Sequence, residues 1–95
     1  MITYDKELEV LEIGKIIISE NVKKRLWPDQ ILSGLYRHLF GDWGDVDEQG
    51  WDANDLAVQK RCRVVSAYES PVHERFLVIT EADRSRTTVL LPEDY

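Results

Sequence analysis

The chain has 95 residues, of which 43% are hydrophobic and 32% are charged, and its formal net charge is -6. This length gives room for one domain, residues 1–95, with a modest hydrophobic core. No apolar run approaches the roughly 20 residues that a membrane span needs. The first residues also lack the cationic and apolar regions of a secretory signal. We therefore expect a cytoplasmic protein without a membrane anchor. The single cysteine excludes an intrachain disulfide and a cysteine-based metal cage.

The first third of the chain predicts a strand followed by a short helix. Residues 10–18 (VLEIGKIII) are rich in β-branched side chains, which favour strands. Gly14 within them indicates a bulge or the close approach of another backbone segment. Ser19 is a residue type that caps helix N-termini, and Pro28 is unfavourable inside a helix. A short helix is therefore expected between Ser19 and Pro28.

A second, amphipathic helix is predicted over residues 30–40, with Asp29 as its N-cap and Gly41 as its end. Apolar residues recur there at helical spacing: Ile31, Leu32, Leu35, Tyr36 and Leu39. His38 falls away from the stripe of apolar residues, so we expect it at the edge of the core or in solvent.

The second half of the chain predicts a third helix and three strands. The helix is placed over residues 46–60, because Asp45 and Glu48 form a variant of the capping-box pattern and no proline interrupts the segment. Three strand-like segments joined by polar turns follow: residues 63–68, 75–80 and 87–91. The predicted fold class is α+β, in the order strand, two or three helices, then a three-stranded antiparallel meander, with the helices packed on one face of the sheet.

Residues 41–59 carry the whole net charge of the chain. This segment has six acidic residues and no Lys or Arg, while the remaining twelve acidic residues balance the twelve basic ones. A concentrated negative field repels nucleic acid and favours a partner protein with a basic surface. Trp43 and Trp51 lie in the same segment, and Trp is enriched in interface hot spots. We expect Trp43 on the surface. The predicted partner-binding residues are Asp42, Trp43, Asp47, Glu48, Trp51, Asp52 and Asp55.

The spacing of Asp42, Asp45 and Asp47 superficially resembles a set of ligands for a hard cation. The EF-hand pattern fails, because it needs alternating acidic positions, a glycine at the sixth position and a glutamate at the twelfth. Capping of the third helix accounts for Asp45, Asp47 and Glu48, since negative charge interacts favourably with a helix N-terminus. The sequence therefore predicts no metal site and no cofactor, and folding that needs no divalent metal.

A small enzyme or ligand-binding domain is the alternative interpretation. The turn at residues 80–85 (TEADRS) places Glu81, Asp83 and Arg84 together, and Asp42 or Asp45 would complete a pocket with them. Turn chemistry predicts the same residue types, because an Asp accepts hydrogen bonds from backbone amides within a turn. The two interpretations differ in whether these two regions, about forty residues apart, meet at one concave pocket.

Two strings of residues resemble a known family. They are HLFGDWGD at residues 38–45 and VITEADRS at residues 78–85, the latter followed by TTVLLP at residues 87–92. Together they are similar to small proteins of plasmids and integrated mobile elements, some of which are labelled as a subunit of type I restriction systems. A restriction methylation subunit is far larger and needs cofactor motifs that this chain lacks. The resemblance implies a mobile-element protein that acts on other proteins, such as an inhibitor of host defence.

The leading hypothesis is a non-enzymatic interaction module or inhibitor whose acidic helix docks on a basic surface of a partner protein, which could itself bind nucleic acid. The enzyme or ligand-binding domain described above is the rival, and a purely structural subunit is the third option. A structural subunit would show a symmetric apolar patch on its exposed surface.

Overall fold

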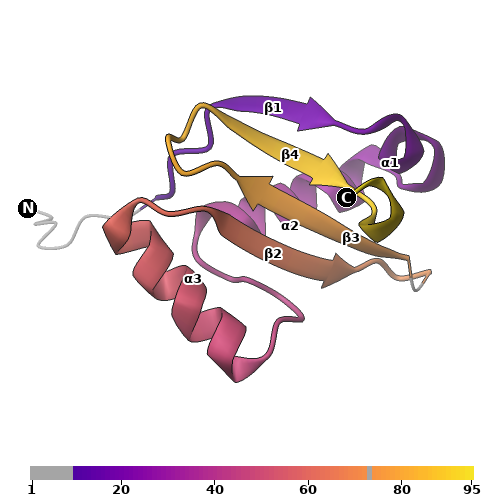
Figure 1. The fold of residues 1–95 in the computed structure, drawn as a ribbon. Helices are drawn as coiled ribbons and strands as arrows, with labels where there is room; N and C mark the ends of the chain where they lie inside the picture. Colours follow the sequence, from indigo (N-terminus) through magenta and orange to yellow (C-terminus); the bar gives the residue numbers. More distant parts are fainter. Residues whose placement is uncertain (1–9, 73) are drawn as a thin grey trace, which may run out of the picture.

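A computed structural model describes residues 10–72 and 74–95 of the chain. A four-stranded sheet with the strand order β1-β4-β3-β2 forms its centre (Figure 1). The β2, β3 and β4 strands pair antiparallel, which confirms the predicted meander, whereas β1 pairs with β4 in parallel. The α+β class is confirmed. In chain order the elements are β1 (Lys15–Ile18), α1 (Glu20–Arg25), α2 (Pro28–Leu39), α3 (Glu48–Lys60), β2 (Val64–Glu69), β3 (Arg75–Thr80), β4 (Arg86–Leu90) and a final 3-10 turn, η1 (Pro92–Asp94).

The first strand is shorter than predicted and begins only at Lys15. Gly14 precedes it with a positive φ of 60°, and a Cβ at this position would collide with the carbonyl of Arg84. This contact confirms that the glycine marks a close approach of two backbone segments. The Ser19 side chain then accepts a hydrogen bond from the Val22 amide at 3.1 Å, so the predicted N-cap of α1 is also confirmed.

The two longer helices begin at residues other than those predicted. Trp27, not Asp29, is the N-cap residue of α2, because Pro28 occupies the first helical position. Proline is favoured there, since its fixed φ suits the helix and its missing N–H is not needed. In α3 the N-cap is Asp47 rather than Asp45, and its carboxylate accepts a hydrogen bond from the Gly50 amide at 2.7 Å. Gly41 follows the end of α2 with a φ of 82°, as its predicted role requires.

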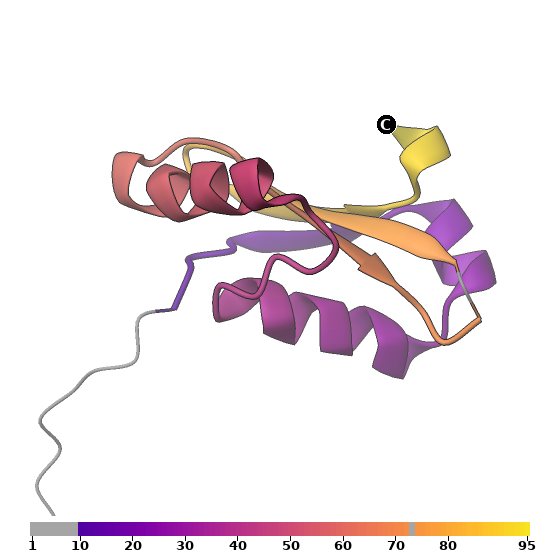
Figure 2. The ribbon, with the colours of Figure 1, turned by 90° about the horizontal axis from the view of Figure 1, so that it is seen from below.

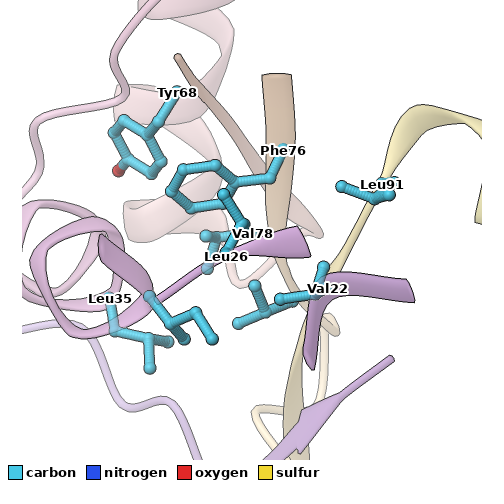
Figure 3. Packing of buried hydrophobic residues seen from close by; sticks show 9 residues of the cluster. Val22, Leu26, Leu35, Tyr68, Phe76, Val78 and Leu91 are labelled. Carbon is cyan, nitrogen blue, oxygen red and sulfur yellow. The ribbon is translucent and has the colours of Figure 1, made fainter. Parts of the chain in front are cut away.

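The main core lies between the sheet and the helices α1 and α2, which are on the same side of it (Figure 2). Gly34 allows the close packing of α2, because a Cβ there would lie 2.6 Å from the Phe76 ring. Figure 3 shows Phe76 next to Tyr68, with ring centroids 5.6 Å apart. The buried members are Val22, Leu26, Ile31, Leu35, Tyr68, Phe76, Val78, Val89 and Leu91.

His38 is fully buried, so the prediction that it lies at the core edge or in solvent is wrong. The buried face of α2 consists of Ile31, Gly34, Leu35 and His38, at helical positions i, i+3, i+4 and i+7. The residues that widen the apolar stripe on the other side, Leu32 and Tyr36, are exposed instead. Gly34 determines this rotation of the helix, because only a residue without a side chain fits against Phe76.

The outer edge of β2 is covered by α3 and by the segment before it (Figure 1). Gly44 forms an isolated parallel bridge with Ala67. In the second turn of α3, the Asn54 side chain donates to the Val65 carbonyl at 2.7 Å and accepts from the Val65 amide at 3.2 Å. The side-chain amide of Asn54 thereby takes the place of a neighbouring strand. It pairs with backbone groups that an edge strand otherwise leaves without partners. A smaller buried cluster lies under this segment: Leu11, Trp43, Ala57 and Val64.

Replacing Asn54 by Ala should lower the free energy of unfolding by about 2 kcal/mol, because a partly buried backbone N–H and C=O both lose their partner. Urea titration with equal slopes for both proteins measures this difference. Asp52→Ala on the exposed side of the same helix is the matched control and should change stability by no more than about 0.5 kcal/mol. Equal losses in the two variants would show that the Asn54 bridge contributes nothing.

Among the helices of residues 10–72 and 74–95, none combines the length and the hydrophobicity that a bilayer span requires.

Candidate functional site

The candidate site is the exposed face of α3, which we call the acidic face and define by Asp47, Glu48, Asp52 and Asp55. All four residues are exposed. The last three follow one another at spacings of four and three, which places them on one side of the helix. Among the described residues none of the four forms an ion pair, and the described part of the chain supplies no partner for the Glu48 and Asp52 carboxylates. The acidic face therefore presents charge that is not compensated within the described structure.

Asp42 is part of a structural corner and not of the acidic face. Its carboxylate accepts two hydrogen bonds from Arg37, at 2.7 and 3.2 Å, and a third from the Gly44 amide at 3.1 Å. The hydrogen bonds from Arg37 are the main reason why the pKa of Asp42 lies below its ordinary value. The Arg37 guanidinium also lies 4.6 Å from the centre of the Tyr68 ring. The structure thus uses this carboxylate to hold the end of α2 against the sheet.

Trp43 is only 1% exposed, so the prediction that it lies on the surface is wrong. The Ala67 amide donates to the Trp43 carbonyl at 3.1 Å, and this pairing with β2 turns the indole toward the interior. The ring meets His38 edge to face, with centroids 5.6 Å apart. Its Nε1–H donates to Asp55 Oδ1 at 2.9 Å, which connects the buried indole to the acidic face. Trp51 is half-buried and packs against the same small cluster.

A cleft of about 460 Å³ opens between the end of α2 and the second half of α3. Leu11 and Trp43 are its buried members, and exposed apolar side chains stand around them. Among the described residues, Asp55 is the only acidic residue in the lining, and no basic residue contributes to it. From residues 10–72 and 74–95, the lining consists of Val10, Leu11, Leu39, Phe40, Gly41, Trp43, Asp55, Val58 and Gln59. The acidic face therefore shares Asp55 with a cleft whose lining combines apolar side chains with polar groups.

The turn at residues 80–85 has the features of a structural turn. Asp83 Oδ1 accepts a hydrogen bond from the Ser85 amide at 3.0 Å, and hydrogen bonds from Ser85 hold the pKa of Asp83 below its ordinary value. Arg84 is buried and donates to three backbone carbonyls, those of Ala57, Cys62 and Glu81. The expected hydrogen bonding inside the turn is confirmed for Asp83, and the guanidinium of Arg84 is engaged by the backbone.

The alternative pocket would combine Asp45 with the turn that carries Glu81, Asp83 and Arg84. These two regions lie near opposite ends of β3. The Asp45 carbonyl accepts a hydrogen bond from Arg75, the first residue of that strand, at 3.3 Å. Glu81 follows the last residue of β3, six positions and therefore roughly 20 Å beyond Arg75 along the extended strand. Glu81 itself pairs with Arg63 at 3.5 Å. The structure therefore does not bring Asp45 together with Glu81, Asp83 and Arg84.

Metal binding and nucleophilic catalysis each need a particular arrangement of polar side chains. Within the described residues, no three His, Cys, Asp or Glu side chains are grouped so that they could hold a metal ion. His38 Nδ1 lies 2.6 Å from Ser66 Oγ, which is the spacing of a nucleophile and its base. Both side chains are completely buried, so a substrate has no access to them. The pair is part of the core.

Comparisons of the chain with protein-family models, with curated proteins and with solved structures find no match. The contact between Trp43 and Asp55 is the feature that the sequence did not reveal. Twelve positions separate the two residues, and no spacing rule connects a loop residue with a helix residue over that distance.

Proposed function

We propose that this protein is a non-enzymatic interaction module whose acidic face docks on a basic surface of a partner protein. The observation that carries the proposal is the row of Glu48, Asp52 and Asp55 on one side of α3, without a counter-charge among the described residues. Such a field attracts cationic partners and accelerates their association. The resemblance of residues 38–95 to small mobile-element proteins favours an inhibitor of a host protein, including one that binds nucleic acid through the same basic surface.

The proposal is tested by neutralising the acidic face without changing its shape. The site variant is Glu48→Gln/Asp52→Asn/Asp55→Asn. The control variant, Glu12→Gln/Glu20→Gln/Asp29→Asn, removes three exposed carboxylates elsewhere and gives the same net charge. The probe is a fluorescent Lys/Arg-rich peptide, and its binding is followed by anisotropy at two salt concentrations.

We expect the site variant to bind the probe about tenfold more weakly than the wild-type protein, because three charge interactions of several tenths of a kcal/mol add to about 1.4 kcal/mol. The control variant should bind within about twofold of wild type. Equal weakening in both variants would show that only net charge matters and would refute a dedicated face. Affinity capture from host lysate with the same two variants then identifies the partner.

A further inference from the structure

The cleft beside Asp55 indicates what kind of basic partner the acidic face accepts. We propose that the partner segment is an amphipathic basic helix, with an apolar side chain that enters the cleft and a neighbouring Lys or Arg that pairs with Asp55. This inference rests on the proposed function and specifies its partner. A purely cationic partner would leave the apolar side chains of the cleft uncovered, and a purely apolar one would leave the Asp55 carboxylate unpaired.

The size and lining of the cleft fit an apolar anchor. Its volume of about 460 Å³ lies within the range of roughly 300 to 1,000 Å³ of ligand pockets. Phe40 on one side is 39% exposed and Val58 on the other side is 37% exposed, so both keep apolar surface in contact with solvent. Covering this surface with an aliphatic or aromatic side chain is favourable, because apolar area is removed from water on both partners.

Asp55 is held in a fixed position at the edge of the cleft. Its Oδ1 accepts the hydrogen bond from the Trp43 indole, and among the described residues neither oxygen pairs with a cation. The indole is itself buried, so the carboxylate is oriented by a rigid group before any partner arrives. Pre-orientation lowers the entropic cost of forming a charge-assisted hydrogen bond. Trp43 thus acts as a positioning residue, and within the described part of the chain no Lys or Arg pairs with Oδ2 of Asp55.

The apolar surface continues from the cleft along α2, which is the reason to expect a helix as the partner segment. The rings of Tyr36 and Phe40 are in contact, with centroids 4.9 Å apart, and Leu32 lies one turn earlier on the same side. All three are exposed. The row from Leu32 to Phe40 spans about 12 Å at 1.5 Å per residue. Amphipathic helices bind such rows through apolar residues at positions i, i+4 and i+7.

Three synthetic peptides of 14 residues separate the contributions. The amphipathic peptide carries Leu at helical spacing between Arg residues, the second peptide replaces each Leu by Ser, and the third replaces each Arg by Gln. Binding is measured by fluorescence anisotropy against the wild-type protein. We expect the amphipathic peptide to bind at least tenfold more tightly than either of the other two.

Protein variants locate the contact. Phe40→Ser and Val58→Ser should each weaken binding of the amphipathic peptide by about tenfold, and should leave binding of the Leu-free peptide unchanged. Leu56→Ser is the matched control, because Leu56 is also exposed on α3 but does not line the cleft. It should bind within about twofold of wild type. Circular dichroism confirms that the variants are folded.

The outcomes distinguish this inference from the proposed function. If the Leu-free peptide binds as tightly as the amphipathic one and the serine variants bind like wild type, the inference is overturned and the acidic face stands. If no Arg-containing peptide binds, both proposals are overturned. Concentration-dependent self-association that Phe40→Ser abolishes would assign the cleft to a second copy of the chain and would also overturn the inference.

Discussion

Arg84→Met should destabilise the protein by about 3 to 5 kcal/mol, one of the two largest effects that we expect. The guanidinium donates to the carbonyls of Cys62 at 2.7 Å, Ala57 at 3.1 Å and Glu81 at 3.2 Å. Hydrogen bonds from charged groups contribute about 1.5 to 3 kcal/mol each, although their contributions are not additive. One of the three acceptors, Ala57, lies in the last turn of α3, where a cation also interacts favourably with the helix dipole.

The matched control for this variant is Arg86→Met, because Arg86 is exposed on the neighbouring strand and should change stability by no more than about 0.5 kcal/mol. Urea titration measures both. Arg84→Lys should give an intermediate loss, since an ammonium is more compact than the planar guanidinium and cannot reach all three carbonyls at once. A loss of less than 1 kcal/mol for Arg84→Met would show that the guanidinium is not the structural clamp described above and would reopen a functional role for the turn.

Local sequence signals predicted most of the elements, because each depended on a few adjacent residues. Ser19 and Gly41 have the predicted roles at the ends of α1 and α2, and the three meander strands lie within one residue of their predicted bounds at either end. The errors occurred where two local signals competed. Asp29 and Asp45 are good capping residues, but Pro28 and Asp47 determine where the helices begin.

The parallel pairing of β1 with β4 was not predicted, since it depends on contacts between residues about seventy positions apart. The same holds for the candidate site. The acidic residues of α3 are exposed, as an acidic segment predicts, but the inward position of Trp43 depends on the bridge between Gly44 and Ala67. No local pattern contains that information, because β2 lies more than twenty positions downstream of the tryptophan.

The burial of His38 is the clearest case of tertiary contacts that outweigh a helical pattern. The hydrogen bonds around the buried ring determine which of its nitrogens carries the proton and which neighbouring hydroxyl groups donate. Thr87 Oγ1 donates to the Ile13 carbonyl at 2.7 Å, so Thr80, 2.6 Å away, must donate to Thr87. Thr80 Oγ1 is then left to accept from His38 Nε2 at 2.8 Å. Nδ1 is consequently the acceptor, and Ser66 donates to it. A neutral imidazole with its proton on Nε2 satisfies every member of this chain.

A protonated His38 breaks this arrangement, because Nδ1–H could no longer accept the Ser66 proton. Burial is the main reason why the pKa of His38 is lowered from 6.5 to about 4, and the nearby positive charge of Arg84 acts in the same direction. The unfolded chain therefore binds this proton between pH 6.5 and pH 4 while the folded protein does not. The stabilising contribution of the neutral, buried His38 is fully present above pH 6.5, and it is lost as the pH falls from 6.5 to 4.

The free energy of unfolding should consequently decrease by about 3 kcal/mol between pH 6.5 and pH 4, since one pKa unit corresponds to about 1.4 kcal/mol. Urea titrations at half-unit steps measure the slope. Asp42, Asp83 and Asp94 have lowered pKa values, so their stabilising contributions are lost mainly below the ordinary carboxylate pKa of 3.8 and fall outside most of this window.

His38→Gln should remove the slope above pH 4, whereas His73→Gln, which changes the other histidine of the chain, should retain it. An unchanged slope in His38→Gln would mean that another group is responsible for the acid sensitivity.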